Sequence, residues 1–121
     1  MTKIELAREA RRQRRLEYLG TNEPRCGVCG EPDDRCLELH HVADHGRDNG
    51  TVAICRNCHR KVSDDQKDHP RLNSAADPAL DRIGHFLLGL ADLLRLIVEK
   101  LAAFGQELID RANSGLNGEA A

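Results

Sequence analysis

The fold of this 121-residue chain is decided by the stretch CGVCGEPDDRCLELHHVADHGRDNGTVAICRNCH, residues 26–59. It holds two cysteine pairs with two residues inside each pair, Cys26 with Cys29 and Cys55 with Cys58. Each pair can present two thiolates to one ion, as a tetrahedral structural zinc (Zn²⁺) site requires. The alternative is four buried cysteines without metal, but paired spacing favours zinc. The fifth cysteine, Cys36, is expected to be a small apolar residue of the core.

The composition explains why such a chain needs a brace. One Tyr, two Phe and no Trp leave the core without the large aromatic side chains that usually fill it. Residues 1–5 show no apolar segment of a secretory signal, so we expect a cytoplasmic protein whose cysteines bind metal rather than form disulfides. The net charge of −2 gives no overall attraction to nucleic acid, so any such affinity must come from a local basic surface.

The pattern of residues predicts an α+β chain in five parts. Residues 1–20 form a basic helix stopped at Gly20, and residues 21–68 form a zinc-bound core with strands over 36–42 and 51–54 and a helix over 56–67. Residues 69–79 form a linker with two prolines. Residues 80–112 form a long amphipathic helix, and 113–121 a disordered tail.

Three histidines have positions that suit a shared site, His40 and His41 between the cysteine pairs and His59 directly after the last cysteine. His40 and His41 are adjacent on the first strand, so they face opposite sides, and one of them can share an ion with His59. For the other three histidines, at positions 45, 69 and 85, we favour ordinary core or surface roles.

These residues resemble the HNH endonuclease motif: LELHHV at 37–42, then Asn49, then CRNCH at 55–59. The resemblance covers about residues 24–68 and implies a ββα-metal (HNH) core. It implies that His41 is the general base and that His40 and His59 hold a divalent ion. Asn49 is taken as the loop-bracing asparagine of the family, one residue before its usual position. Where some members carry a further metal-binding histidine, this chain has Ser63, with Asp64 a candidate for the outer shell of the ion.

The chemistry of these residues permits phosphodiester hydrolysis. A neutral imidazole at position 41 can take a proton from water, while an ion neutralises charge on the phosphate. Because imidazole suits transition ions, we expect Mn²⁺, Ni²⁺ or Co²⁺ to serve better than Mg²⁺. We expect DNA as the partner, with RNA left open, since phosphate contacts carry no base information. The phosphate contacts are assigned to Arg11, Arg12, Arg15, Arg60 and Lys61, the alternative for the first three being a solvated face.

The C-terminal helix extends for about 48 Å, longer than a small nuclease core is wide. The 19-residue window over 86–104 is interrupted by charged residues, Asp92, Arg95, Glu99 and Lys100, so no membrane partner is expected. We expect one side to pack on the N-terminal helix and the remaining apolar surface to form a homodimer.

Two other classes compete with the nuclease. A catalytically inert zinc module that binds nucleic acid or protein explains the cysteines and arginines but not the three histidines. An oligomerisation or membrane-surface subunit explains only the last third of the chain.

Overall fold

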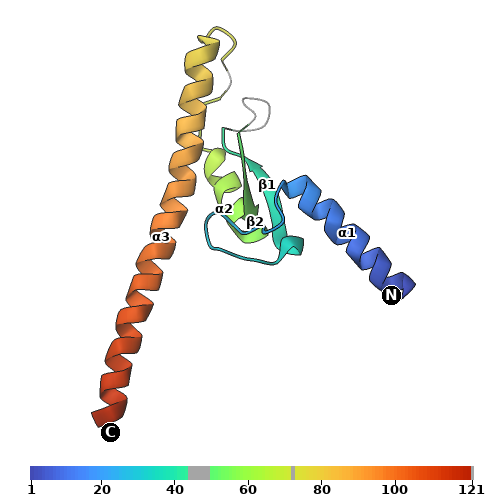
Figure 1. Cartoon of the computed structure of the whole chain (residues 1–121). Coiled ribbons are helices and arrows are strands. Elements are labelled where there is room, and N and C mark those ends of the chain that lie inside the picture. Colours follow the sequence, from blue (N-terminus) through green and yellow to red (C-terminus); the bar gives the residue numbers. More distant parts are fainter. Residues whose placement is uncertain (44–49, 72, 121) are drawn as a thin grey trace.

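The structure is a computed structural model that describes residues 1–43, 50–71 and 73–120, with side chains up to residue 115 (Figure 1). Its elements are α1 (Lys3–Leu19), the 3-10 helix η1 (Asp34–Cys36), β1 (Leu37–His41), β2 (Thr51–Cys55), α2 (Arg56–Gln66) and α3 (Pro78–Ala120). The described residues therefore form an α+β fold, as predicted. β1 is two residues shorter than the strand predicted over 36–42, and β2 is one residue longer than the strand predicted over 51–54. α2 ends one residue earlier than predicted.

The centre of the molecule is the antiparallel hairpin of β1 and β2 with α2 following directly. In its register Leu37 lies opposite Cys55 and His41 opposite Thr51. Ile54 of β2 and Val62 of α2 are fully buried, and Leu93 and Leu96 of α3 complete the same core. The small apolar core thus lies between the hairpin, α2 and one part of α3.

Helix α1 ends where its sequence predicts but begins at Lys3, two residues later than expected. Thr2 and Glu5 form a reciprocal capping box at its start, and Gly20 ends it in the left-handed conformation, with φ of 77°. Such a φ favours glycine because it has no Cβ. Only Leu16 and Leu19 of this helix are buried, so α1 attaches by its last turns and projects away from the core (Figure 1).

Helix α3 packs on α2, on the side of the core away from α1 (Figure 1). The expectation that it packs on the N-terminal helix was wrong. Its core-facing residues are His85, Gly89, Asp92, Leu93 and Leu96, which recur at helical spacing. At Gly89 the helix lies so close to the segment after β1 that a Cβ would meet the carbonyl oxygen of Val42 at 1.6 Å.

The bounds of α3 also differ from the prediction. The side chain of Asp77 accepts hydrogen bonds from the amides of Ala79 and Leu80, at 2.9 and 3.1 Å, which sets the helix start two residues earlier. The helix ends at Ala120, where a disordered tail from residue 113 was expected. Residues 113–120 contain weak helix formers but no proline, so nothing there breaks the backbone hydrogen bonds. None of the helices that the structure describes is long and apolar enough to cross a membrane.

Candidate functional site

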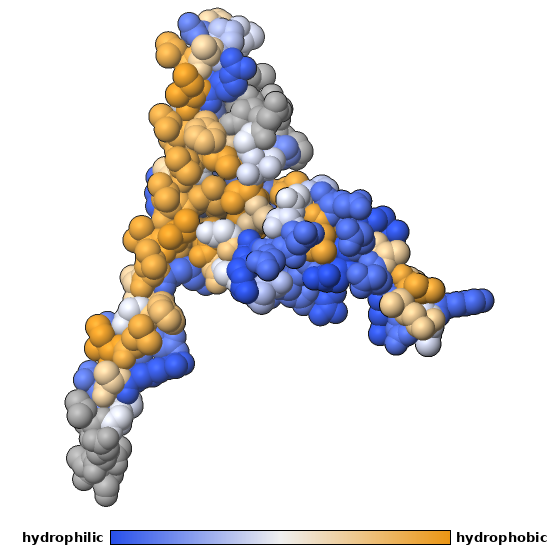
Figure 2. All heavy atoms as spheres, in the orientation of Figure 1, coloured by the Kyte–Doolittle hydropathy of each residue, from blue (hydrophilic) through white to orange (hydrophobic). Residues whose placement is uncertain are grey.

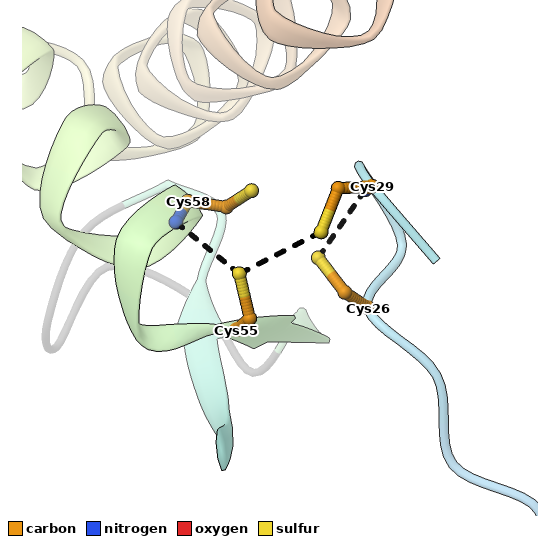
Figure 3. Close-up of side chains that lie close together, drawn as sticks. All are labelled: Cys26, Cys29, Cys55 and Cys58. Atoms are coloured by element: carbon orange, nitrogen blue, oxygen red, sulfur yellow. Dashed lines mark hydrogen bonds between the residues drawn. The ribbon is translucent and has the colours of Figure 1, made fainter. Parts of the chain in front are cut away.

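The four predicted cysteines converge on one point (Figure 3). Cys26 and Cys29 come from the loop before η1, Cys55 ends β2, and Cys58 lies in the first turn of α2. Their sulfur atoms all lie within 4.8 Å of one another, and those of Cys29 and Cys55 are 3.7 Å apart. A tetrahedral zinc with Zn–S bonds of about 2.3 Å places its sulfurs about 3.8 Å apart. The cluster therefore has the size of a four-cysteine metal site.

Backbone geometry builds this cluster from both sides. The amides of Val28 and Cys29 each lie 3.4 Å from Cys26 Sγ, and the amide of Cys58 lies 3.5 Å from Cys55 Sγ. The amide of Gly27 donates to the carbonyl of Ala53 on β2 at 2.9 Å, which attaches the first pair to the hairpin. Both turns thus direct N–H groups at sulfur, as thiolate ligands require.

The surroundings of Cys26, Cys29 and Cys58 shift the pKa values of their thiols in different directions. Burial raises the pKa of Cys26, but hydrogen bonds from backbone amides, that of Cys29 first, outweigh burial and lower the pKa to about 7. For Cys58, burial raises the pKa, and the neighbouring thiols of Cys55 and Cys26 raise it further. Four crowded thiolates need a positive charge among them, and a divalent ion bound by all four supplies it.

The structure brings His40 and His59 together across the gap between β1 and α2. The two imidazole rings meet edge to face, with centroids 5.1 Å apart and planes at 70°. Only 2% of His40 is exposed. Two imidazoles that share one ion through bonds of about 2.1 Å place their centroids roughly 5 Å apart. The spacing of this pair fits two ligands of one ion.

The third histidine, His41, is the next residue on β1 and is half-buried. Alternation along the strand sets its side chain on the face opposite that of His40. Its carbonyl oxygen accepts a hydrogen bond from Gln66 Nε2 at 3.2 Å, which connects the end of β1 to the end of α2. Asn49 lies outside the described residues, so its prediction stays a prediction.

Glu38 belongs to this site and was missed by sequence reasoning. It precedes His40 by two residues on the same face of β1, and its carboxylate accepts a 2.6 Å hydrogen bond from His59 Nδ1. Arg56 Nε also lies 3.4 Å from the same carboxylate. The period-two spacing before His40 was the available signal. A carboxylate on Nδ1 fixes the orientation of the His59 ring and leaves Nε2 as the ring nitrogen that could bind an ion.

Beside His59 the surface is hollowed over about 450 Å³. This hollow is lined by Glu38, Arg56, Asn57, His59, Arg60 and Ser63. Arg60 also lines a second hollow of about 800 Å³ along α2, together with Lys61, Lys67 and Lys100. Arg60 thus lies next to both His59 and the cysteine cluster, and Lys61 lies next to the cysteine cluster, where both favour an anionic ligand.

The basic cluster of α1 lies elsewhere and is partly engaged within the chain. Arg11, Arg12 and Arg15 line a hollow of about 740 Å³ along the helix. Arg15 Nε donates to Asp34 of η1 at 2.7 Å, and Arg12 Nε lies 3.8 Å from the same carboxylate. The hydrogen bond from Arg15 lowers the pKa of Asp34. Arg15 therefore attaches α1 to the core, whereas Arg11 forms no ion pair with the residues that the structure describes and is available to a phosphate.

Comparison of the chain with protein-family models, with curated proteins and with solved structures finds no match.

Proposed function

We propose that this chain is a metal-dependent endonuclease of the HNH type that hydrolyses phosphodiester bonds in DNA. The observation that carries the proposal is the pairing of His40 with His59 across β1 and α2, with His41 adjacent on the strand. The sequence resemblance to the HNH motif assigns the same three positions. A hairpin followed at once by a helix is also the arrangement that the resemblance implies.

Each side chain then has a defined task. His41 takes the proton from the attacking water, because a neutral imidazole has a ring nitrogen that can accept one. His40 and His59 hold the divalent ion, and Glu38 keeps the His59 ring in the orientation that binds it. When bound, the ion neutralises charge on the phosphate and the leaving oxygen. Arg56 and Arg60 hold the phosphate at the hollow beside His59.

The two metal sites call for different ions. We assign zinc to the cysteine cluster, because four thiolates with tetrahedral spacing select it. For the histidine pair we expect Mn²⁺, Ni²⁺ or Co²⁺, with Mg²⁺ weaker because it prefers oxygen ligands. A cluster of reduced thiols belongs in a reducing compartment such as the cytoplasm.

The second candidate is an inert zinc module that binds nucleic acid or protein. The basic hollow next to the cysteine cluster favours it, since this surface needs no catalyst to bind an anion. The inert module does not explain why His40 pairs with His59 or why Glu38 contacts His59. Cleavage separates the two candidates.

The experiment measures nicking of supercoiled plasmid as a function of Mn²⁺ concentration, with EDTA as the blank. We expect His41→Ala to retain both metals and to lose at least about a hundredfold in rate. For His40→Ala and His59→Ala we expect lower affinity for Mn²⁺, measured by calorimetry, with zinc retained. If His41→Ala cleaves DNA at the wild-type rate, the mechanism is wrong. If His41→Ala only raises the Mn²⁺ concentration needed for cleavage, then His41 is the ion ligand and His40 the base.

Three further arms complete the design. Glu38→Gln should raise the Mn²⁺ requirement less than His59→Ala, because it removes an orienting contact rather than a ligand. Linear duplex, single-stranded DNA and RNA, tested with the same series of ions, report the substrate class. Binding of all these nucleic acids without cleavage under any ion would favour the inert module.

A further inference from the structure

Helix α3 carries a continuous apolar surface on the side that faces away from the core (Figure 2). Large apolar side chains along it are exposed, most of them by half or more. They are Leu80, Ile83, Leu87, Leu88, Leu94, Val98, Leu101, Phe104, Leu108 and Ile109. The core-facing residues of the same helix lie on the opposite side, so this surface is left uncovered by the described residues of the chain.

A seven-residue repeat organises this surface. Leucine recurs at every seventh position, at 80, 87, 94, 101 and 108. Four residues after each leucine stands a glycine or an alanine, except at the middle position, which is valine. These residues are Gly84, Ala91, Val98, Gly105 and Ala112. We call the two rows together the leucine stripe. Positions separated by four and by seven share one face of a helix, so the leucines and the small residues form adjacent rows.

The leucine stripe combines protruding and empty positions. Leu101 is 66% exposed, whereas a Cβ built at Gly84 or Gly105 would meet nothing within 4 Å. Side chains that insert into spaces between side chains of a facing helix are the basis of heptad packing. The leucine stripe therefore carries both the knobs and the holes of such a contact, and both recur every seven residues along the same part of α3.

The exposed surface is large enough for a stable contact. Ten large side chains, each about half exposed, present on the order of 800 Å² if each contributes roughly 80 Å². This is about the area that one partner contributes to a standard interface. It exceeds the largest apolar patch of an ordinary monomer, about 300–600 Å².

We propose that the leucine stripe of α3 binds the leucine stripe of a second copy of this chain in an antiparallel pair. A second copy has the same period and length, and a two-fold contact uses one self-complementary surface twice. In a parallel pair each residue would face its own copy, so Gly84 would face Gly84 and leave a void. In the antiparallel pair that overlaps the whole stripe, Leu87 lies opposite Gly105 and Leu101 opposite Ala91. Leucine then meets glycine or alanine in four of the five layers, and Leu94 meets Val98 in the central layer, which favours close packing.

This inference does not depend on nuclease activity, and its first test is the mass in solution. Light scattering of the zinc-loaded chain at micromolar concentration should give about twice 13.5 kDa. The double variant Leu94→Glu, Leu101→Glu should weaken association on the order of a hundredfold or more and give 13.5 kDa. The matched control is Ile4→Glu on α1, since Ile4 is 64% exposed but lies off the stripe; it should remain dimeric.

Circular dichroism and zinc content verify that each variant is folded. A wild-type monomer, a mass larger than a dimer, or a folded double variant that stays dimeric would overturn the proposal.

The second test reads the orientation by oxidative cross-linking of engineered cysteines. Leu87→Cys alone should give no disulfide-linked dimer, whereas a mixture of Leu87→Cys and Gly105→Cys chains should give the mixed dimer. A cross-link of Leu87→Cys with itself would show parallel pairing and overturn the orientation. Wild-type protein oxidised in the same way controls for the native cysteines.

Discussion

Gly89 offers the sharpest test of how α3 is held on the core. A methyl group at this position would lie 1.6 Å from the carbonyl oxygen of Val42 and 2.6 Å from its carbonyl carbon. Both atoms belong to the backbone, so no side-chain rotation can relieve the overlap. The same carbonyl accepts a hydrogen bond from Gln66 at 3.3 Å, which further restrains it. Gly89→Ala must therefore displace α3 from the segment that follows β1.

The expected magnitude follows from two opposing terms. Ordinary contact needs a separation of about 3–3.5 Å, so the helix must shift by roughly 1.5 Å. Overpacking of this kind typically costs about 1–3 kcal/mol, and a backbone obstacle places the cost at the upper end. Replacing glycine by alanine within a helix returns about 0.5–1 kcal/mol. We expect a net loss of about 1–2 kcal/mol in the free energy of unfolding.

Gly84 provides the matched control, because it lies in the same helix and a Cβ there would meet nothing within 4 Å in the single chain. Since Gly84 belongs to the leucine stripe, both glycine variants are made in the monomeric chain that carries Leu94→Glu and Leu101→Glu, which serves as their wild-type reference. Gly84→Ala should be more stable than the wild type by about 0.5–1 kcal/mol. Urea unfolding at fixed protein and zinc concentrations measures both variants, since zinc binding and any association shift the midpoint. If Gly89→Ala is as stable as Gly84→Ala, α3 does not dock on the core through this contact.

Three more predictions concern the remaining attachments. Cys29→Ser should lose zinc and unfold the central unit, because a structural zinc supplies on the order of 10 kcal/mol; elemental analysis that finds no zinc in folded wild-type protein would refute the site. Changing Arg11, Arg12 and Arg15 together to Ala should weaken binding to all DNA sequences alike and flatten its salt dependence, while Arg15→Ala alone should mainly loosen α1 because Arg15 pairs with Asp34. Arg15 lowers the pKa of Asp34, so this pair stabilises α1 at pH values above the ordinary Asp pKa of about 3.9. The stabilisation is lost as the pH falls through the lower pKa of the folded state. Hydrogen exchange in the last turns of α1 should show this pH dependence, and Asp34→Asn should remove it.

The parts of the fold that the sequence predicts are those fixed by local chemistry. Gly20 ends α1 because its left-handed conformation costs glycine little, and this is readable from one residue. The cysteine cluster is equally readable, because two thiols separated by two residues in a tight turn already point the same way. The hairpin follows from its β-branched residues and the turn formers between its strands.

The docking of α3 could not be predicted in the same way. An amphipathic pattern shows which positions of a helix are apolar, but α3 is apolar on two sides, and the pattern does not say which side meets the core. The decision depends on Gly89, whose missing side chain admits the backbone of Val42, and on the buried Asp92. The contact of Glu38 with His59 was not predicted for a related reason. The two residues are 21 positions apart in the sequence, so only the folded chain shows that they are neighbours.

Two histidines expected to be ordinary structural residues make attachments on α3. His69 donates to Asp92 at 2.6 Å, and Asp92 also accepts a 2.6 Å hydrogen bond from Arg95. His85 lies within hydrogen-bond distance of the carbonyl oxygens of Pro70 and Asp81, at 3.0 and 2.9 Å. Because Asp92 is 3% exposed, its charge needs these partners, and the contacts bind the segment after α2 to α3.

The cysteine cluster and the histidine pair are joined through the start of α2. Cys55 caps this helix, since its sulfur accepts from the Cys58 amide, and His59 follows Cys58 directly. An ion held by the four cysteines therefore fixes the first turn of α2 against the hairpin that carries His40 and Glu38. Loss of that ion would release the His59 ring from its place beside β1 even though none of the histidines binds it. Cys58, a ligand of the structural ion, immediately precedes His59 of the histidine pair. The bound ion would therefore hold the two imidazoles at a set distance in a core that is poor in aromatic residues.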